Sequence, residues 1–170
     1  MVELREPGGT AVGERVRTLV LLDPEAPIGA RAEALLYAAA RAQAVDEIVA
    51  PALARGAHVV ADRFIDSSLA YQGAARALGI ASVRAVNDFA IAGVLPDRTV
   101  LLELPTSDAR ERRAGVPDDR IEAEAADFHE LVAQGYRELM AAEPERIVRV
   151  AADGDPDLVA ERVREALGGD

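Results

Sequence analysis

Four short apolar runs are separated by longer segments with helical periodicity, and no hairpin turn joins one run to the next. The runs cover residues 1–4, 58–61, 99–104 and 147–150. Strands that are separated by helices need crossover connections, which produce a parallel sheet with helices on both faces. The sequence therefore predicts an α/β fold.

The segments between these runs predict the helices. They span 12–20, 31–55, 67–78, 82–91, a short stretch after Pro105, 120–142 and 157–167. Thr10 is the expected N-cap of the first helix, because a threonine hydroxyl can accept a hydrogen bond from an early backbone N–H. Pro51 is expected to kink or break the second helix. The apolar stripe expected on that helix consists of Leu35, Leu36, Ala39, Ala42 and Val45.

Length and composition narrow the possible functions. A chain of 170 residues fits a single domain, which we expect to span 1–170. The formal net charge of −11 disfavours nucleic acid as a partner. No apolar run approaches the roughly 18 residues that cross a membrane, and the first residues lack a signal-peptide pattern, so we expect a cytoplasmic protein with no membrane partner. The chain contains no Cys and no Lys, which excludes thiolate and lysine chemistry and the lysine of a Walker A loop.

Polar residues that follow a strand are the first candidates for a ligand site, because ligands of open parallel sheets bind beyond the carboxyl ends of the strands. Asp62 and Arg63 follow the run 58–61 directly. A guanidinium can bind a phosphate or a carboxylate through two parallel hydrogen bonds, and Asp62 could orient it or reach a metal-bound water. The alternative is a structural ion pair at the end of the strand.

Three other segments place polar groups near the same edge. Residues 5–10 form a Pro-Gly-Gly turn after the first run, where the backbone could approach a ligand or simply reverse direction. Tyr37 and Arg41 are four residues apart and share a helix face, which would suit a nucleobase and its phosphate, or ordinary surface packing. Tyr71 and Gln72 follow Asp62 and Arg63 closely, and the alternative for Tyr71 is a half-buried ring on an amphipathic helix.

Several arginines surround the Gly/Pro loop at 115–118. They are Arg110, Arg112, Arg113 and Arg120. Such a composition is expected of a mobile cationic lid, at about 108–120, that covers transferring phosphates, although solvated helix ends have the same composition. The acidic residues at 118–122 could contact this lid or Mg²⁺, or cap the following helix.

Taken together, these segments resemble bacterial thymidylate kinase over nearly the whole chain. The matching motifs are Arg5–Thr10, Arg31–Tyr37 with Arg41, Asp62–Phe64 ahead of Ser67–Gly73, and Asp119–Glu122. The resemblance implies a P-loop NTPase-like parallel sheet and transfer of the γ-phosphoryl group of ATP to dTMP, giving dTDP, with Mg²⁺ bridging the phosphates. It also implies a homodimer.

The resemblance assigns roles to individual residues. The catalytic set is Arg63, Arg112, Arg113 and Arg120. The substrate-binding set is Arg5, Tyr37, Arg41, Asp62, Arg63, Ser68, Tyr71, Gln72 and Glu122. The arginines that match Arg41 and Arg63 hold the dTMP phosphate, and the aromatic residue that matches Tyr37 stacks on thymine. The remaining matches line the thymidine pocket or, at Glu122, lie near the metal and the sugar; no protein metal ligand is assigned.

One departure from the family is large. Thymidylate kinases begin with a central strand, a Walker A loop and a helix, for which this sequence has no counterpart. We therefore expect a sheet without its central strand, a 170-residue chain that is catalytically inactive by itself, and an upstream reading frame that encodes a glycine-rich loop with Lys. The alternatives are a non-catalytic nucleotide-binding or interaction protein and a kinase for another nucleoside monophosphate.

Overall fold

A computed structural model describes residues 1–23, 27–104 and 118–168. The chain divides into two compact units. The first contains Met1–Leu95 and Asp118–Tyr136, and the second contains Pro96–Pro117 and Arg137–Asp170. The single folding domain expected from chain length stays a prediction.

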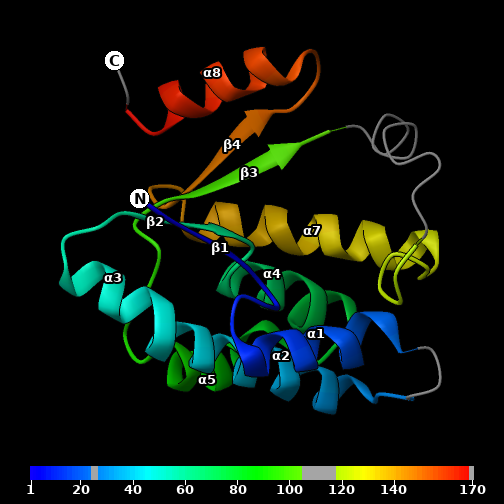
Figure 1. Cartoon of the computed structure of the whole chain (residues 1–170). Helices are drawn as coiled ribbons and strands as arrows, with labels where there is room; N and C mark the ends of the chain where they lie inside the picture. The colour runs from blue at the N-terminus through cyan, green and yellow to red at the C-terminus, as the bar shows by residue number, and fades with distance from the viewer. Residues whose placement is uncertain (24–26, 105–117, 169–170) are drawn as a thin grey trace. The chain divides into compact units, whose positions relative to one another are not determined.

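All four predicted strands are present, and they pair in parallel (Figure 1). In the first unit, β1 (Val2–Arg5) pairs with β2 (Val59–Asp62). In the second unit, β3 (Thr99–Glu103) pairs with β4 (Ile147–Ala151). Because each connection between the paired strands passes through helical segments, the α/β prediction is confirmed. The described strands thus form two sheets of two strands each, β1–β2 and β3–β4.

The first helix begins where the sequence predicts. Thr10 caps α1 (Ala11–Arg17), and its Oγ1 accepts a hydrogen bond of 2.9 Å from the backbone N–H of Gly13. The helix then widens into a π-helical segment, η1 (Thr18–Leu22). The capped turn holds the loop at residues 5–10 against the start of α1.

The second helix differs from its prediction in two ways. It runs as α2 (Ala30–Ala44), a π-helical segment η2 (Val45–Val49) and α3 (Ala50–Ala54), so Pro51 does not end it. Pro51 is the second residue of α3 and comes just after the change from π-helical to α-helical hydrogen bonding at the end of η2. The predicted apolar stripe is only partly confirmed: Val45 is buried, but Leu35 is 57% exposed, and Glu33 and Arg41 are buried instead. The physical reason is that both charges are paired inside the protein, as described below.

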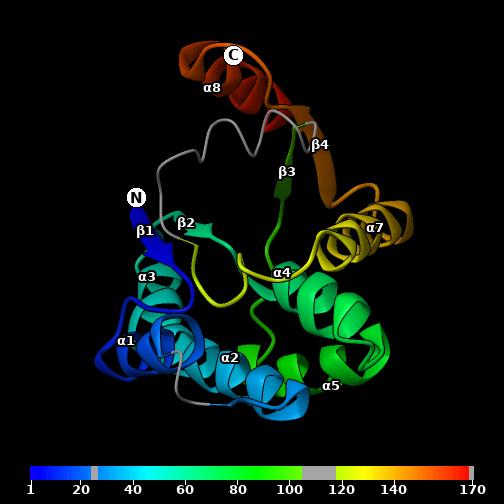
Figure 2. The same cartoon turned by 90° about the vertical axis from the view of Figure 1, so that its right-hand side faces the viewer.

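The remaining helices complete the two units. They are α4 (Ile65–Ser68), the π-helical η3 (Leu69–Ala75), α5 (Ile80–Ile91), α7 (Ala126–Ala142) and α8 (Pro156–Ala166). In the first unit α2 packs between α1 and α5 (Figure 2). The predicted start of α7 at residue 120 is wrong, because the Asp119 side chain accepts hydrogen bonds from the backbone N–H groups of Ile121 and Glu122 and forms a turn instead.

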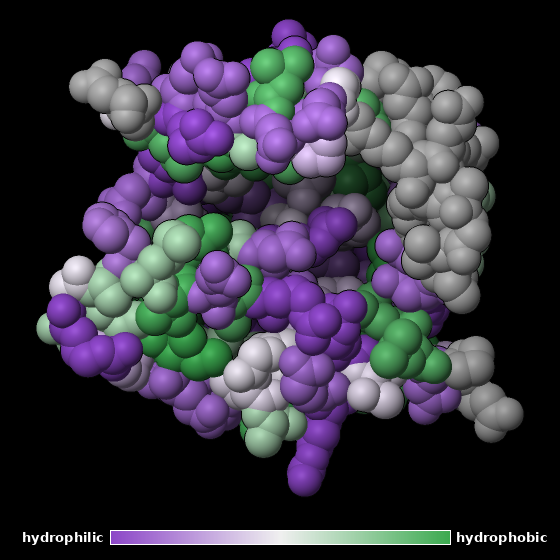
Figure 3. Space-filling view, turned by 45° about the horizontal axis from the view of Figure 1, so that its top comes forward, coloured by the Kyte–Doolittle hydropathy of each residue, from purple (hydrophilic) through white to green (hydrophobic). Residues whose placement is uncertain are grey.

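Small and branched apolar residues form the core beneath β1 and β2. One cluster contains Leu4, Ala44 and Val49, with Ile48, Val59 and Val94 packed against it. On the face seen in Figure 3, hydrophilic side chains lie between smaller apolar areas. None of the described helices combines the length and the apolar character of a membrane span.

Candidate functional site

The end of β2 presents a cationic side chain in an unusual backbone conformation. Asp62 is the last residue of β2, and Arg63 follows with φ of +67°, in the left-handed region that residues other than glycine rarely occupy. The Arg63 guanidinium carbon lies 5.2 Å from the centre of the Tyr71 ring. The structure therefore brings Arg63 and Tyr71 together, with the guanidinium stacked on an aromatic face.

Arg41 lies in a buried cluster beside this strand end and is 1% exposed. Its Nε donates to Glu6 Oε2 at 2.8 Å, its Nη1 to Ser68 Oγ at 2.9 Å and to Asn87 Oδ1, and its Nη2 to the carbonyl oxygen of Phe64 at 3.1 Å. Since Phe64 is the residue after Arg63, the two arginines lie at the same end of β2. All three guanidinium nitrogens of Arg41 already have partners in the protein.

The two carboxylate oxygens of Glu6 differ in their hydrogen bonding. One carboxylate oxygen binds Arg41, but Oε1 is buried and has no hydrogen-bond partner among the described residues. Burial raises the pKa of Glu6 above its ordinary value, and the Arg41 charge and hydrogen bond only partly oppose this.

A second buried cluster surrounds Glu33 on α2, which is 1% exposed. Gln72 Nε2 and Arg76 Nε donate to Glu33 Oε1 at 2.9 and 3.3 Å. Arg76 Nη2 and Arg120 Nη2 donate to Glu33 Oε2 at 3.2 and 2.6 Å. Burial alone would raise the pKa of Glu33, but the hydrogen bonds from Gln72, Arg120 and Arg76 hold it below its ordinary value.

Tyr37 is half-buried and lies one helical turn after Glu33. Burial raises the pKa of its hydroxyl, and the charge of Glu33 raises it further, while the charges of Arg120 and Arg63 oppose the rise. The predicted pairing of Tyr37 with Arg41 is less direct, because the Arg41 guanidinium turns to Glu6.

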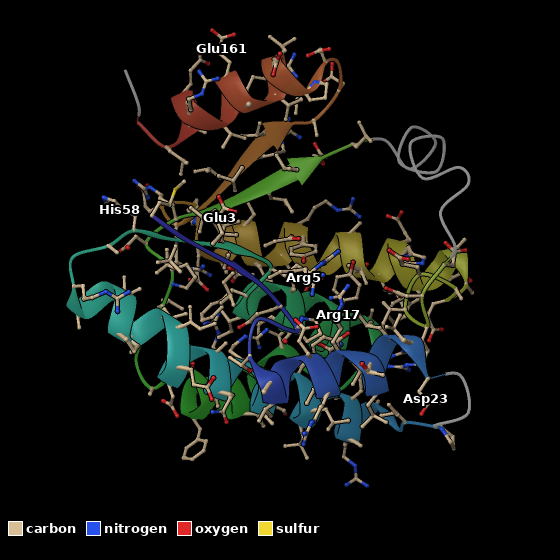
Figure 4. All side chains as sticks on the ribbon, in the orientation of Figure 1. Glu3, Arg5, Arg17, Asp23, His58 and Glu161 are labelled. Carbon is tan, nitrogen blue, oxygen red and sulfur yellow. The ribbon has the colours of Figure 1, made fainter. Side chains whose placement is uncertain are left out.

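Arg5 and Asp62 occupy opposite positions on β1 and β2 and line an open cavity of about 320 Å³. Figure 4 labels Arg5 and Glu3, two of the lining residues, on β1. Glu3, Leu4 and Val60 complete the lining. The Arg5 side chain is about half exposed, and its Nη2 lies 3.2 Å from Glu14 Oε1. This cavity is lined by two of the predicted site residues, Arg5 and Asp62.

The segment that follows the lid is described only from residue 118. Arg120 Nε donates to the carbonyl oxygen of Val20 at 2.7 Å, and Glu122 Oε2 accepts from the backbone N–H of Asp119 at 3.0 Å. The predicted lid residues Arg110, Arg112 and Arg113 lie outside the described residues.

Several residues that hold the site together were not predicted from the sequence. They are Glu6, Glu33, Asn87 and Tyr136. The Tyr136 hydroxyl lies 2.8 Å from Ser67 Oγ, its ring meets that of Tyr71 edge to face, and burial raises its pKa to about 12. The available signal was a charged residue within an alanine-rich helix, since Glu33 falls inside the Arg31–Tyr37 motif.

In the part of the chain that the structure describes, no group of three or more His, Asp or Glu side chains is arranged to hold a metal ion.

A parallel α/β fold with guanidinium groups beside an aromatic ring at the end of a strand defines an anion-binding protein of the nucleotide-handling class. The thymidylate kinase family model matches residues 1–163. The chain is 49% identical over 166 residues to the thymidylate kinase of Clavibacter sepedonicus, covering 96% of this chain and 78% of that protein. The corresponding enzyme of Rhizorhabdus wittichii is 46% identical over 170 residues, with 98% and 82% covered. The chain belongs to the thymidylate kinase family.

Proposed function

We propose that this protein is a phosphotransferase that moves the γ-phosphoryl group of ATP to dTMP, giving dTDP. Family membership supports the reaction. The observation that carries it in the structure is the exposed Arg63 guanidinium, which stands over Tyr71 at the end of β2. This arrangement offers a cation for the phosphate and an aromatic face beside it.

The proposed reaction is an in-line displacement. A phosphate oxygen of dTMP attacks the γ-phosphorus of ATP and forms a new P–O bond, while the bond from that phosphorus to the β,γ-bridging oxygen breaks and ADP leaves. Negative charge on the transferring group is stabilised by arginines rather than removed by a base. Arg63 and Arg120 are the described candidates, and Mg²⁺ would enter with the phosphates of ATP.

The proposed substrate-binding residues fall into a buried group and a more accessible group. Arg41, Ser68 and Gln72 are each at most 2% exposed and hydrogen-bonded to other side chains, so we propose that they form and hold the wall of the pocket. Arg63 and the rings of Tyr37 and Tyr71 are more accessible and are proposed to face the nucleotide. Arg5, Asp62 and Glu122 remain proposed contacts at the margin.

Thermal unfolding with and without nucleotides tests the binding half of this proposal. At a dTMP concentration of about 100 times Kd, the native state gains about 2.7 kcal/mol, which for this chain length raises Tm by roughly 5 to 10 °C. We expect smaller shifts with dUMP and dCMP and none with AMP. If no nucleotide shifts Tm, the arginines serve only to stabilise the fold; if another monophosphate gives the largest shift, the protein has a different substrate.

Turnover and assembly need separate measurements. Because the 170 residues include no Lys, we expect no release of ADP above background from ATP and dTMP in a coupled assay of this chain. Normal turnover would contradict that expectation while supporting the reaction. The family also suggests a homodimer, which sedimentation velocity would detect as twice the mass of the chain.

A further inference from the structure

We propose that Glu33 is a positioning residue that holds Gln72 and Arg120 in the arrangement in which they meet the nucleotide. This inference rests on the proposed function, which places Gln72 in the wall of the nucleotide pocket and Arg120 beside the transferring phosphoryl group. Gln72 belongs to η3, Arg120 to the turn before α7, and Glu33 to α2. One buried carboxylate therefore joins three segments that are far apart in the sequence.

Both carboxylate oxygens of Glu33 are occupied by hydrogen-bond donors. Each oxygen of Glu33 accepts two hydrogen bonds, at distances of 2.6 to 3.3 Å, and Arg76 binds both oxygens through Nε and Nη2. Bidentate and charge-assisted bonds of this kind fix direction as well as distance. Glu33 thus determines where the Gln72 amide and the Arg120 guanidinium point.

The charge of Glu33 is what makes the orientation unique. Its pKa is lowered despite burial, so the carboxyl group is ionised near neutral pH and can only accept hydrogen bonds. Gln72 must therefore turn its Nε2 toward Glu33, which leaves its carbonyl oxygen directed elsewhere. A neutral residue at position 33 could donate or accept, and the amide of Gln72 would lose its fixed orientation.

Arg120 depends on Glu33 more than Arg76 does. Arg76 has a second carboxylate, since its Nη2 lies 2.6 Å from Glu124 Oε1. The guanidinium of Arg120 has Glu33 as its described carboxylate partner, together with the carbonyl oxygen of Val20. Loss of the Glu33 charge should therefore release Arg120 while Arg76 stays paired with Glu124.

Three variants separate positioning from simple support of the fold. Glu33→Gln removes the charge, Glu33→Asp keeps it on a shorter side chain, and Glu124→Gln removes the other carboxylate of Arg76 without touching Gln72 or Arg120. Calorimetric titration with dTMP is carried out below the unfolding transition of each protein. We expect Kd to rise at least about tenfold for Glu33→Gln, less for Glu33→Asp, and less than twofold for Glu124→Gln.

A measurement without ligand reports on the two positioned groups directly. In ¹H–¹⁵N spectra, the Gln72 side-chain amide and the Arg120 Nε–H should give single, dispersed signals in the wild-type protein and in Glu124→Gln. In Glu33→Gln both signals should move toward the positions of exposed side chains. If Glu33→Gln does not fold, the comparison is made with Glu33→Asp. In that variant the Gln72 side-chain signal should broaden through exchange, and the Arg120 signal should shift by a smaller amount.

The outcomes distinguish the two proposals. If the wild-type protein binds no dTMP, the proposed function fails, and the spectra alone then decide whether Glu33 orients its partners. Unchanged Gln72 and Arg120 signals in the folded Glu33 variant would overturn the positioning role. An equal loss of dTMP affinity in Glu33→Gln and Glu124→Gln would also overturn it, because the effect would then pass through Arg76 and the fold.

Discussion

Glu6 and Glu33 are two buried carboxylates of the same unit with opposite ionisation behaviour. They are 4% and 1% exposed, and both pair with arginine. Glu6 has one arginine partner and an oxygen without a partner, and its pKa is raised. Glu33 receives four hydrogen bonds, and its pKa is lowered. Burial raises the pKa of both carboxylates, and only at Glu33 do the added hydrogen bonds outweigh it.

The arginine partners differ in the same way. The side chain of Arg41 is 2% exposed, whereas those of Arg76 and Arg120 are 18% and 21% exposed. If its partner is lost, Arg41 is left as an unpaired charge inside the protein, but Arg76 and Arg120 can turn toward water. Damage to the Glu6 cluster should therefore cost more stability than damage to the Glu33 cluster.

The largest effect is expected for Arg41→Met, which leaves the carboxylate of Glu6 buried without a cation. We expect the free energy of unfolding in urea to fall by about 3 to 5 kcal/mol at neutral pH. Adding Glu6→Gln to this variant should recover part of the loss. The matched control is Arg5→Gln, since the exposed Arg5–Glu14 pair should contribute nothing measurable.

A smaller loss is expected for Glu33→Gln. Its arginine partners can reach solvent, so the free energy of unfolding should fall by about 2 to 3 kcal/mol in the same urea assay. If Glu33→Gln proves more damaging than Arg41→Met, the comparison between the two clusters is wrong.

The pH dependence should differ in sign between the two carboxylates. The lowered pKa of Glu33 stabilises the fold above its ordinary value of 4.5, and this stability is lost as pH falls through the lowered value. The raised pKa of Glu6 means that the native state binds its proton more tightly, so stability is lost as pH rises through the raised value. As pH falls from 7 to 3, the free energy of unfolding of the wild-type protein should decrease relative to that of Glu33→Gln. Over the same range it should increase relative to that of Glu6→Gln. Parallel profiles for the two variants would contradict this assignment.

The smallest effect is expected for Tyr136→Phe, which removes the hydrogen bond between Tyr136 and Ser67 but keeps the ring contact with Tyr71. The free energy of unfolding should fall by about 1 kcal/mol, the usual net value of one such bond. Absorbance titration of the tyrosines should show one group near pH 12 in wild type that is absent from the variant. A normal titration of all three tyrosines would show that Tyr136 is not buried as described.

The strands and most helices were predictable because their signals are local. Each strand run is short and apolar, and the hydroxyl of Thr10 precedes its helix at the spacing that capping requires. The start of α7 was predicted wrongly because helix propensity alone does not reveal that Asp119 accepts two backbone hydrogen bonds. Local competition between a side chain and the helix decided that boundary.

The buried face of α2 could not be predicted for a different reason. The spacing of apolar residues along α2 indicates which residues share a helix face, but it does not show which charged residues are paired. For this reason Leu35 was expected on the buried face and Glu33 was given no role. Glu33 is buried only because Gln72, Arg76 and Arg120 arrive from distant segments. Candidate ligand residues such as Arg63 were identified because they follow a strand directly, which is a local feature.

The central claim is that the guanidinium after β2 binds the phosphate of a pyrimidine nucleotide. Calorimetric titration of dTMP into the wild-type protein and into Arg63→Gln tests it most directly, because Arg63 is exposed and its replacement should leave Tm nearly unchanged. We predict that Kd rises at least about 30-fold in the variant, as expected for loss of a charge-assisted phosphate contact. Equal affinity in the two proteins would contradict it.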